Sequence, residues 1–315
     1  MGLDATIGAP SGRTLKFAAF FAVASLAAAA LAAEEVRITE ETPYVQSPDI
    51  VVETMLEMAG VRADDFVIDL GSGDGRIVIR AAKERGARGF GVDYDPRLVQ
   101  LATENARAAG VSDRVIFYQQ DIFKTSLESA SVITMYLLPE YNLNLRPRLL
   151  ALKPGTRVVS HDYDMGEWAP DARRTIPVPE KKVDGGKKST IFFWVVPARV
   201  AGKWRSALPA GGRRVEFELE QKYQEISGTA TIRGRRFELE RPVLRGDFIS
   251  FRLDDGKRTY SFSGRASAGR MAGKVGLGER AYRWRALRSD SGPRRAPGRA
   301  PKPASASGAT GRSSL

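Results

Sequence analysis

Three glycines and an acidic residue within residues 66–95 have the types and spacing of a nucleoside-binding site. One apolar run leads into Gly71, Gly73 and Gly75, and a second apolar run ends at Asp93. Glycines at a strand-to-helix turn let the backbone approach a ligand closely and leave helix N–H groups facing it. An acid at the end of the next strand is placed to accept the hydroxyls of a ribose. We therefore predict a nucleoside-containing ligand at this turn.

The spacing of the glycines separates two kinds of nucleoside site. Dinucleotide-binding turns carry Gly-x-Gly-x-x-Gly, whereas this chain has Gly-x-Gly-x-Gly, with Asp69 two residues ahead of the first glycine. This pattern resembles motif I of the class I (seven-β-strand) S-adenosylmethionine methyltransferases. A third element, residues 114–123, adds a strand that ends in Asp121 and Ile122, as in that family. The glycine-rich turn of an NAD enzyme is the alternative interpretation.

The resemblance implies S-adenosylmethionine as the cofactor and assigns positions around it. It places Asp69 and the loop backbone by the methionine end and Asp93 by the ribose. It places Asp121 and Ile122 beside the adenine. The expected cofactor-binding residues are Tyr44, Asp69, Gly71, Ser72, Gly73, Gly75, Asp93, Tyr94, Asp121 and Ile122. No metal ligand is expected.

In this class of enzymes the loop after the fourth strand, here residues 135–142, borders the methyl acceptor. Methyltransferases of DNA amino groups and of protein glutamine carry Asn/Asp-Pro-Pro-Tyr at this place, and this chain lacks it. A lysine acceptor has a pKa of about 10.4 and must lose a proton before it attacks. Apolar, aromatic surroundings lower that pKa, and a carboxylate orients the ammonium. The candidate catalytic residues are therefore Tyr136, Glu140, His161 and Asp162, with Tyr141 beside them.

Each of these residues also has a purely structural interpretation. Tyr136 could face the core, and Asp162 could pair with an arginine. Glu140 could cap a helix after Pro139. His161 could be a hydrogen-bonded residue at a strand end instead of a catalytic base.

A longer set of matches resembles one branch of class I enzymes. It consists of Tyr44 in an extended lead-in, residues 69–78, the Asp-Pro pair at 95–96, the Leu-Pro-Glu at 138–140 and residues 160–168. That branch includes archaeal broad-specificity protein lysine methyltransferases and the mitochondrial ATP-synthase c-subunit lysine methyltransferase. The likeness covers roughly residues 43–196 and implies a protein substrate with a methylatable lysine. The N-terminal segment and the β-rich C-terminal region are not part of the archaeal enzymes.

Composition excludes several chemistries and places the positive charge. The chain has no cysteine and one histidine, which excludes thiol catalysis and any site that needs two histidines. The net charge is −3 over residues 1–198, +10 over 199–287 and +5 over 288–315. The basic C-terminal region therefore favours an anionic partner, a membrane or an acidic protein, and a solvated basic face is the alternative. It contains no specific nucleic-acid motif.

The N-terminal residues 1–33 have the pattern of a signal peptide or membrane anchor. Arg13 and Lys16 precede an alanine-rich apolar run, residues 17–33, and small residues precede Glu34. The run is short for a membrane span, which needs about 20 residues. We expect export to the periplasm or anchoring at the inner membrane. Anchoring on the cytoplasmic side is the alternative, favoured by where S-adenosylmethionine is made.

Between residues 34 and 198 the chain alternates strands and helices, which predicts a doubly wound, Rossmann-like α/β methyltransferase domain. The expected helices include residues 48–59, residues 96–109 and a short piece at 148–152, ended by Pro154-Gly155. In such open sheets, ligands bind beyond the carboxyl ends of the strands.

Residues 199–288 change to short alternating runs divided by Gly, Pro and Asp. This spacing predicts a small antiparallel all-β domain, a barrel or a sandwich, that begins its strands at residue 215. Residues 289–315 are rich in Pro, Gly, Ser and Arg and are expected to be a disordered basic tail.

The leading hypothesis is therefore an S-adenosylmethionine-dependent methyltransferase that modifies protein lysines. One alternative is a methyltransferase acting on a small molecule or lipid at the membrane. A second is a non-catalytic envelope protein that binds a partner through its β-rich domain.

Overall fold

The computed structural model describes residues 44–181, 186–209, 211–267 and 269–289. The expected N-terminal signal or anchor lies outside these ranges, as does the expected tail beyond Ser289. Within the described ranges, no helix is both long and apolar enough to cross a membrane.

The first domain contains a seven-stranded mixed sheet with the strand order β3-β2-β1-β4-β5-β7-β6. Strands β1 to β5 pair in parallel, and β7 runs antiparallel between β5 and β6. The bounds are β1 (Phe66–Leu70), β2 (Arg88–Asp93), β3 (Val115–Gln119), β4 (Val132–Met135), β5 (Arg157–His161), β6 (Ala172–Pro177) and β7 (Lys188–Val195). The order reverses between β1 and β4, so the carboxyl ends of β1, β2 and β4 meet at one edge.

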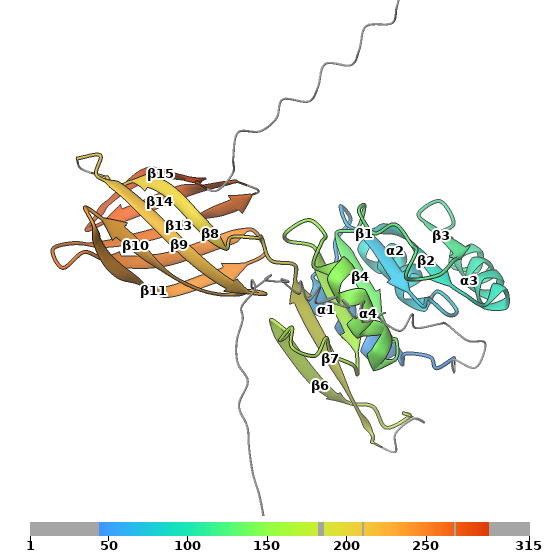
Figure 1. The fold of residues 1–315 in the computed structure, drawn as a ribbon. Helices are drawn as coiled ribbons and strands as arrows, with labels where there is room; N and C mark the ends of the chain where they lie inside the picture. The colour runs from blue at the N-terminus through green and yellow to red at the C-terminus, as the bar shows by residue number, and fades with distance from the viewer. Residues whose placement is uncertain (1–43, 182–185, 210, 268, 290–315) are drawn as a thin grey trace, which may run out of the picture. The chain divides into compact units, whose positions relative to one another are not determined.

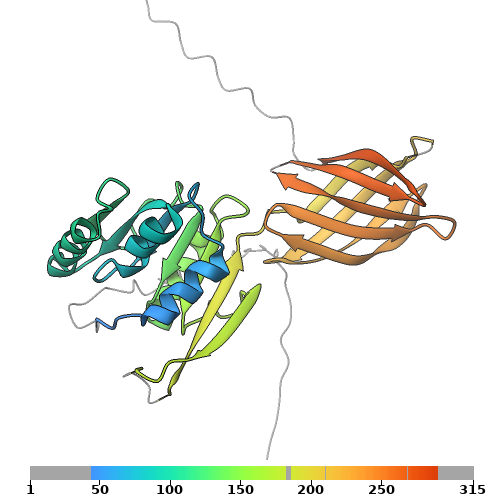
Figure 2. The ribbon, with the colours of Figure 1, turned by 180° about the vertical axis from the view of Figure 1, so that it is seen from behind.

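Helices cover both faces of this sheet, as the doubly wound fold requires. They are α1 (Asp49–Ala59), α2 (Arg76–Arg85), α3 (Pro96–Ala108) and α4 (Pro139–Leu149). α4 lies in front of the sheet in Figure 1, whereas α1 lies in front in Figure 2. Alternate strand residues supply the two cores, because successive side chains point to opposite faces. Val67 and Val132 pack with α1, and Ile68 and Ile133 pack with α4.

The position of α4 corrects the expected helical piece at residues 148–152. The helix begins at Pro139 and ends at Leu149. Tyr141, Leu145 and Leu149 are buried at spacings of four residues, which is one helix face. Pro139 is tolerated because the first-turn N–H has no intrahelical partner. Pro147, inside the helix, disguised this periodicity in the sequence.

The second domain is a closed antiparallel barrel of eight strands, larger than the small β domain expected. The bounds are β8 (Gly202–Ala207), β9 (Arg214–Lys222), β10 (Glu225–Ile232), β11 (Arg235–Arg245), β12 (Phe248–Asp254), β13 (Thr259–Ser267), β14 (Arg270–Leu277) and β15 (Arg280–Arg288). β8 closes it by pairing with both β9 and β15. The sequence prediction missed β8, because its alternation of Lys203, Trp204 and Arg205 contains a single large apolar residue.

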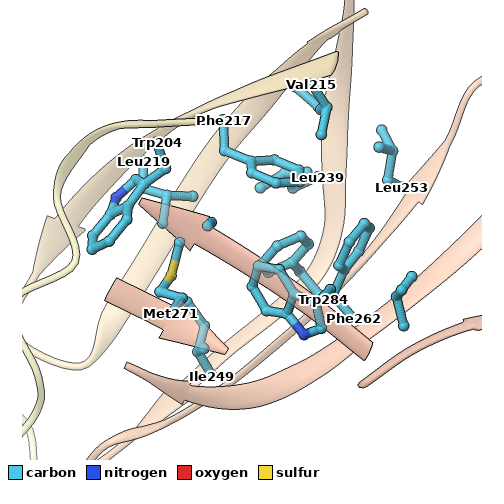
Figure 3. Close-up of a cluster of buried hydrophobic side chains, with 14 of the residues drawn as sticks. Trp204, Val215, Phe217, Leu219, Leu239, Ile249, Leu253, Phe262, Met271 and Trp284 are labelled. Carbon is cyan, nitrogen blue, oxygen red and sulfur yellow. The ribbon is translucent and has the colours of Figure 1, made fainter. Parts of the chain in front are cut away.

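Aromatic side chains fill the interior of the barrel. The ring of Phe217 meets those of Phe251 and Phe262 edge to face, with centroids 5.2 and 5.4 Å apart. Trp284 joins the same cluster from β15, and Trp204 is fully buried (Figure 3). An eight-stranded barrel is just wide enough for side chains to fill. The barrel therefore has a packed core.

Candidate active site

The loop between β1 and α2 turns sharply because three of its residues are glycines. Gly71, Gly73 and Gly75 have φ angles of +73°, +53° and +80°, a region that L side chains rarely adopt. Packing also requires glycine at the middle position: a Cβ on Gly73 would lie 2.6 Å from the Tyr44 ring. α2 begins at Arg76, so its first N–H groups adjoin this loop.

Asp93 ties the glycine loop to the end of β2. Its Oδ2 accepts a hydrogen bond from the backbone N of Gly73 at 2.9 Å, and its Oδ1 accepts one from the N of Asp95 at 3.1 Å. The carboxylate lines the cavity beside this loop. Asp93 is therefore held in a fixed position beyond the carboxyl end of its strand, where a ligand hydroxyl could reach it.

Asp69 is a buried carboxyl with one unused oxygen. Its Oδ1 accepts a hydrogen bond from Thr134 Oγ1 at 2.7 Å, while Oδ2 has no hydrogen-bond partner among the described residues. Burial, together with the charges of Asp93 and Asp74, raises the pKa of Asp69 to about 7. A buried, unpartnered carboxyl oxygen on a cavity wall suits a cationic ligand group.

A lead-in segment, residues 44–47, is fastened across the loop by Arg76. The guanidinium donates to the carbonyl O of Ser47 at 2.9 Å and pairs with Asp74 at 2.7 Å. Gln46 donates to the carboxylate of Asp74 at 3.1 Å and to the hydroxyl of Tyr44 at 2.9 Å. Tyr44 therefore lies over Gly73 at the edge of the cavity.

The cavity has a volume of about 900 Å³ and joins these groups. Of the expected cofactor residues it is lined by Tyr44, Asp69, Gly71, Ser72, Gly73, Asp93, Tyr94 and Ile122. Gly75 lies behind the lining and Asp121 does not contribute to it. Asp121 accepts a hydrogen bond from the N of Phe123 at 2.8 Å and pairs with Lys124 at 3.3 Å.

Tyrosines line the far end of the cavity. The rings of Tyr136 and Tyr163 lie nearly parallel, with planes inclined by 16° and centroids 6.3 Å apart. Leu137, Leu138 and Tyr141 complete this end. Tyr163 was not among the expected site residues, although residues 160–168 belong to the segment that carries the family resemblance.

Three of the four expected catalytic residues lie outside the cavity lining. His161 is buried behind Tyr136, with Nδ1 3.0 Å from Ser47 Oγ and Nε2 2.9 Å from Ser189 Oγ. Glu140 is an exposed residue in the first turn of α4. Their expected catalytic roles remain predictions.

Asp162, the third of these residues, is a nearly buried ion-pair partner. It pairs with Lys181 at 2.8 Å and accepts the backbone N–H of Thr190 at 2.8 Å. Burial opposes ionisation, but hydrogen bonds from His161 and Lys181 outweigh it and hold the pKa of Asp162 well below its usual range. The alternative interpretation named an arginine as the partner of Asp162, and the structure places a lysine there. Its expected catalytic role also remains a prediction.

Comparisons with known proteins match the first domain. A family model described as the ANTKMT methyltransferase domain matches residues 69–172. The protein-lysine N-methyltransferase of Saccharolobus islandicus is 40% identical over 156 residues, 49% of this chain and 93% of that protein. The mouse adenine nucleotide translocase lysine N-methyltransferase is 38% identical over 42% of this chain and 58% of its own length.

A solved RNA methyltransferase from Salinibacter ruber, in complex with S-adenosyl-L-homocysteine, is also similar. It is 50% identical, covers 50% of this chain and 96% of its own, and has a TM-score of 0.45.

The chain belongs to the class I S-adenosylmethionine-dependent methyltransferases, in the family of the Saccharolobus protein-lysine N-methyltransferase. S-adenosylmethionine is its cofactor, and the residues present fit that molecule. The unpartnered Oδ2 of Asp69 suits an ammonium group, and Asp93 suits a ribose. Within the described residues, no group of His, Asp and Glu side chains is arranged to hold a metal ion.

Sequence reasoning missed Asp74, Arg76 and Gln46. Asp74 and Arg76 both belong to the Gly-Ser-Gly-Asp-Gly-Arg run, so the signal was their place in the motif. Their partners in the lead-in segment lie about 28 residues earlier, a pairing that spacing alone does not reveal.

Proposed function

We propose that this chain transfers the methyl group of S-adenosylmethionine to lysine side chains of proteins. The observation that carries the proposal is the tyrosine-lined end of the cavity. Tyr136 and Tyr163 line the same cavity as Asp69. The name and 40% identity of the Saccharolobus relative support the same acceptor class.

S-adenosylmethionine, when bound, supplies a sulfonium methyl group that an in-line nucleophile displaces. The chain's contribution is to align a neutral amine and to exclude water. The aromatic faces of Tyr136 and Tyr163 attract an incoming ammonium. The leucines beside them, Leu137 and Leu138, desolvate it, which lowers the lysine pKa toward neutrality and favours loss of the proton before attack.

We assign the cofactor-binding roles as follows. Asp69 accepts the cofactor's ammonium group, and Asp93 accepts its ribose hydroxyls while holding the loop through Gly73. Ile122 and Tyr94, both on the cavity wall, flank the adenine. His161 acts from behind Tyr136 as a positioning residue, and Asp162 fixes the backbone at the end of β5 through Thr190.

The test uses the purified full chain, labelled S-adenosylmethionine and a lysate separated into protein, RNA and lipid fractions. Half of the protein fraction has its lysines blocked beforehand by acetylation, which leaves no basic amine to accept a methyl group. We expect label in the unblocked protein, released as methyl-lysine on acid hydrolysis, and none in the blocked sample. Asp93→Ala serves as the control with weakened cofactor binding and should give less label at a limiting concentration of S-adenosylmethionine. Label confined to RNA or to lipid contradicts the proposal.

We also propose that the basic region, residues 199–288, contacts an anionic surface and that residues 1–33 export or anchor the chain. Two observations support this: the region's net charge, and the apolar run that follows Arg13 and Lys16. Anchoring on the cytoplasmic side keeps the enzyme supplied with cofactor.

A further inference from the structure

Charge is divided unevenly around the outer wall of the barrel. Strands β9, β10 and β11 carry six carboxylates, at Glu216, Glu218, Glu220, Glu225, Glu238 and Glu240. Strands β13, β14 and β15 carry none. Strands β9–β11 also carry six cations, which balance their carboxylates, whereas the charged side chains of β13–β15 are all cationic.

Five cations gather on the outer side of β13–β15, which we name the basic face: Arg265, Arg270, Lys274, Arg283 and Arg285. The strand register joins them in rows, since directly opposed residues share one side of a sheet. Ala272 lies between Arg265 and Arg285, and Lys274 lies opposite Arg283.

Most of this charge is uncompensated. Arg265 pairs with Asp247. The other four cations form no ion pair with any residue that the structure describes, and all four side chains are exposed. Holding like charges on adjacent strands is unfavourable unless an anionic partner compensates them.

Apolar groups and small residues complete the basic face. Phe248 lies opposite Arg265 and is 42% exposed, and Leu287 lies opposite Arg270 and is 50% exposed. Ser263 and Ala272 are small, so their side chains do not project between the cations. A basic surface with one exposed aromatic ring lacks the stacking platforms that bind single-stranded nucleic acid. Cations with exposed apolar neighbours match the headgroup layer of an anionic bilayer.

We infer that the basic face docks on the surface of an anionic phospholipid membrane. The inference deepens the proposed anionic contact of residues 199–288 by naming the surface and its partner. The basic cluster and the apolar residues 17–33 would supply two separate membrane signals, and stable anchoring generally takes two.

The test measures flotation of the full chain with vesicles of phosphatidylcholine, with or without phosphatidylglycerol. Binding to phosphatidylcholine alone reports the apolar segment, so the quantity that matters is the increase caused by phosphatidylglycerol. The face variant is Lys274→Gln/Arg283→Gln/Arg285→Gln. The matched control, Arg214→Gln/Arg235→Gln/Arg236→Gln, removes equal charge from β9 and β11.

In the face variant, we expect the increase in binding caused by phosphatidylglycerol to fall on the order of 100-fold. Each basic residue near the surface contributes about 1 kcal/mol. The control should lose less than about tenfold, because β9 and β11 lie across the closed barrel from β13–β15 and charges beyond about 10 Å are largely screened. Equal losses in both variants, or no increment in the wild type, overturn the inference. Tighter binding of mixed-sequence RNA than of anionic vesicles at the same salt also overturns it.

Two further measurements separate a loss of membrane binding from misfolding and from a loss of methyl transfer. Matching thermal unfolding curves show that both variants are folded. Methyl transfer to protein in solution, without vesicles, tests the lysine proposal independently, so either proposal can fail while the other stands.

Discussion

The imidazole ring of His161 lies against the phenol ring of Tyr136, with ring centroids 4.0 Å apart and planes inclined by 33°. Both imidazole nitrogens are within hydrogen-bond distance of serines, Ser47 on one side and Ser189 on the other. Ser47 belongs to the lead-in segment that also carries Tyr44. His161 therefore links the cover of the cofactor cavity to the wall proposed to face the acceptor.

Replacing His161 with alanine should loosen Tyr136 more than it disturbs the cofactor cavity. We expect a loss of about 3 kcal/mol in unfolding free energy, the scale of removing a buried ring. The KM for the protein acceptor should rise by a larger factor than the calorimetric dissociation constant for S-adenosylmethionine, because Ser47 of the lead-in segment also loses a partner. Ser189→Ala, which keeps the ring and removes one hydrogen bond, is the control and should cost about 1 kcal/mol. An unchanged KM alongside weakened cofactor binding contradicts the positioning role.

Asp93→Ala should weaken S-adenosylmethionine binding. The variant loses charge-assisted hydrogen bonds to the ligand and releases the backbone of Gly73. We expect a loss of about 1–3 kcal/mol by titration calorimetry. Asp64→Ala removes an exposed carboxylate at the other end of the sheet and should leave affinity unchanged. Equal affinities for all three proteins contradict the assignment.

Gly73→Ala and Gly110→Ala form a matched pair that isolates the contact with Tyr44. Both positions have positive φ, +53° and +73°, so each alanine should cost about 1–2 kcal/mol of backbone strain. Open space surrounds Gly110, whereas a Cβ at Gly73 meets the Tyr44 ring. Only Gly73→Ala should also reduce cofactor affinity. Gly73→Ala should also lose more unfolding free energy than Gly110→Ala, measured by denaturant unfolding. Adding Tyr44→Ala to Gly73→Ala should remove this difference. A difference that persists contradicts the contact.

Asp69 should make stability depend on pH. Its pKa of about 7 exceeds the usual value of 3.8, because burial disfavours the charged form. The folded chain then binds more protons than the unfolded chain between these values, so the free energy of unfolding falls as pH rises from about 4 to 7. The fall is up to about 4 kcal/mol from this group. Asp69→Asn should lose this component, and identical pH slopes for the two proteins contradict it.

The N-terminal prediction is tested by the mass of the mature chain. Export with cleavage gives a protein that begins near Glu34, whereas anchoring leaves the full chain in the membrane fraction. Recovery of the full chain from Met1 in the soluble fraction contradicts both expectations.

Local sequence determined much of the cofactor half of the site. Gly73 and Asp93 were predicted because a strand, a tight turn and a second strand fix their relative positions over a short stretch of chain. The same logic predicted the mainly parallel sheet. The cofactor role of Asp121 stays a prediction, since its carboxylate pairs with Lys124 and does not line the cavity.

The acceptor half depends on packing between distant segments, and the sequence revealed less of it. Tyr163 reaches the cavity only because β5 lies beside β4, and His161 lies behind Tyr136 for the same reason. α4 was misplaced because Pro147 interrupts the pattern of its buried face. β8 was missed because its role is to close the barrel, a property of the whole ring of strands.

Closure of the barrel limits how anything can bind it. Every described strand from β8 to β15 has a hydrogen-bonded neighbour on each side, so the ring offers no edge for another chain to extend by strand addition. Recognition by this domain must therefore pass through its side chains and loops and not through strand pairing. Single substitutions there can abolish a contact while leaving the backbone ladder intact.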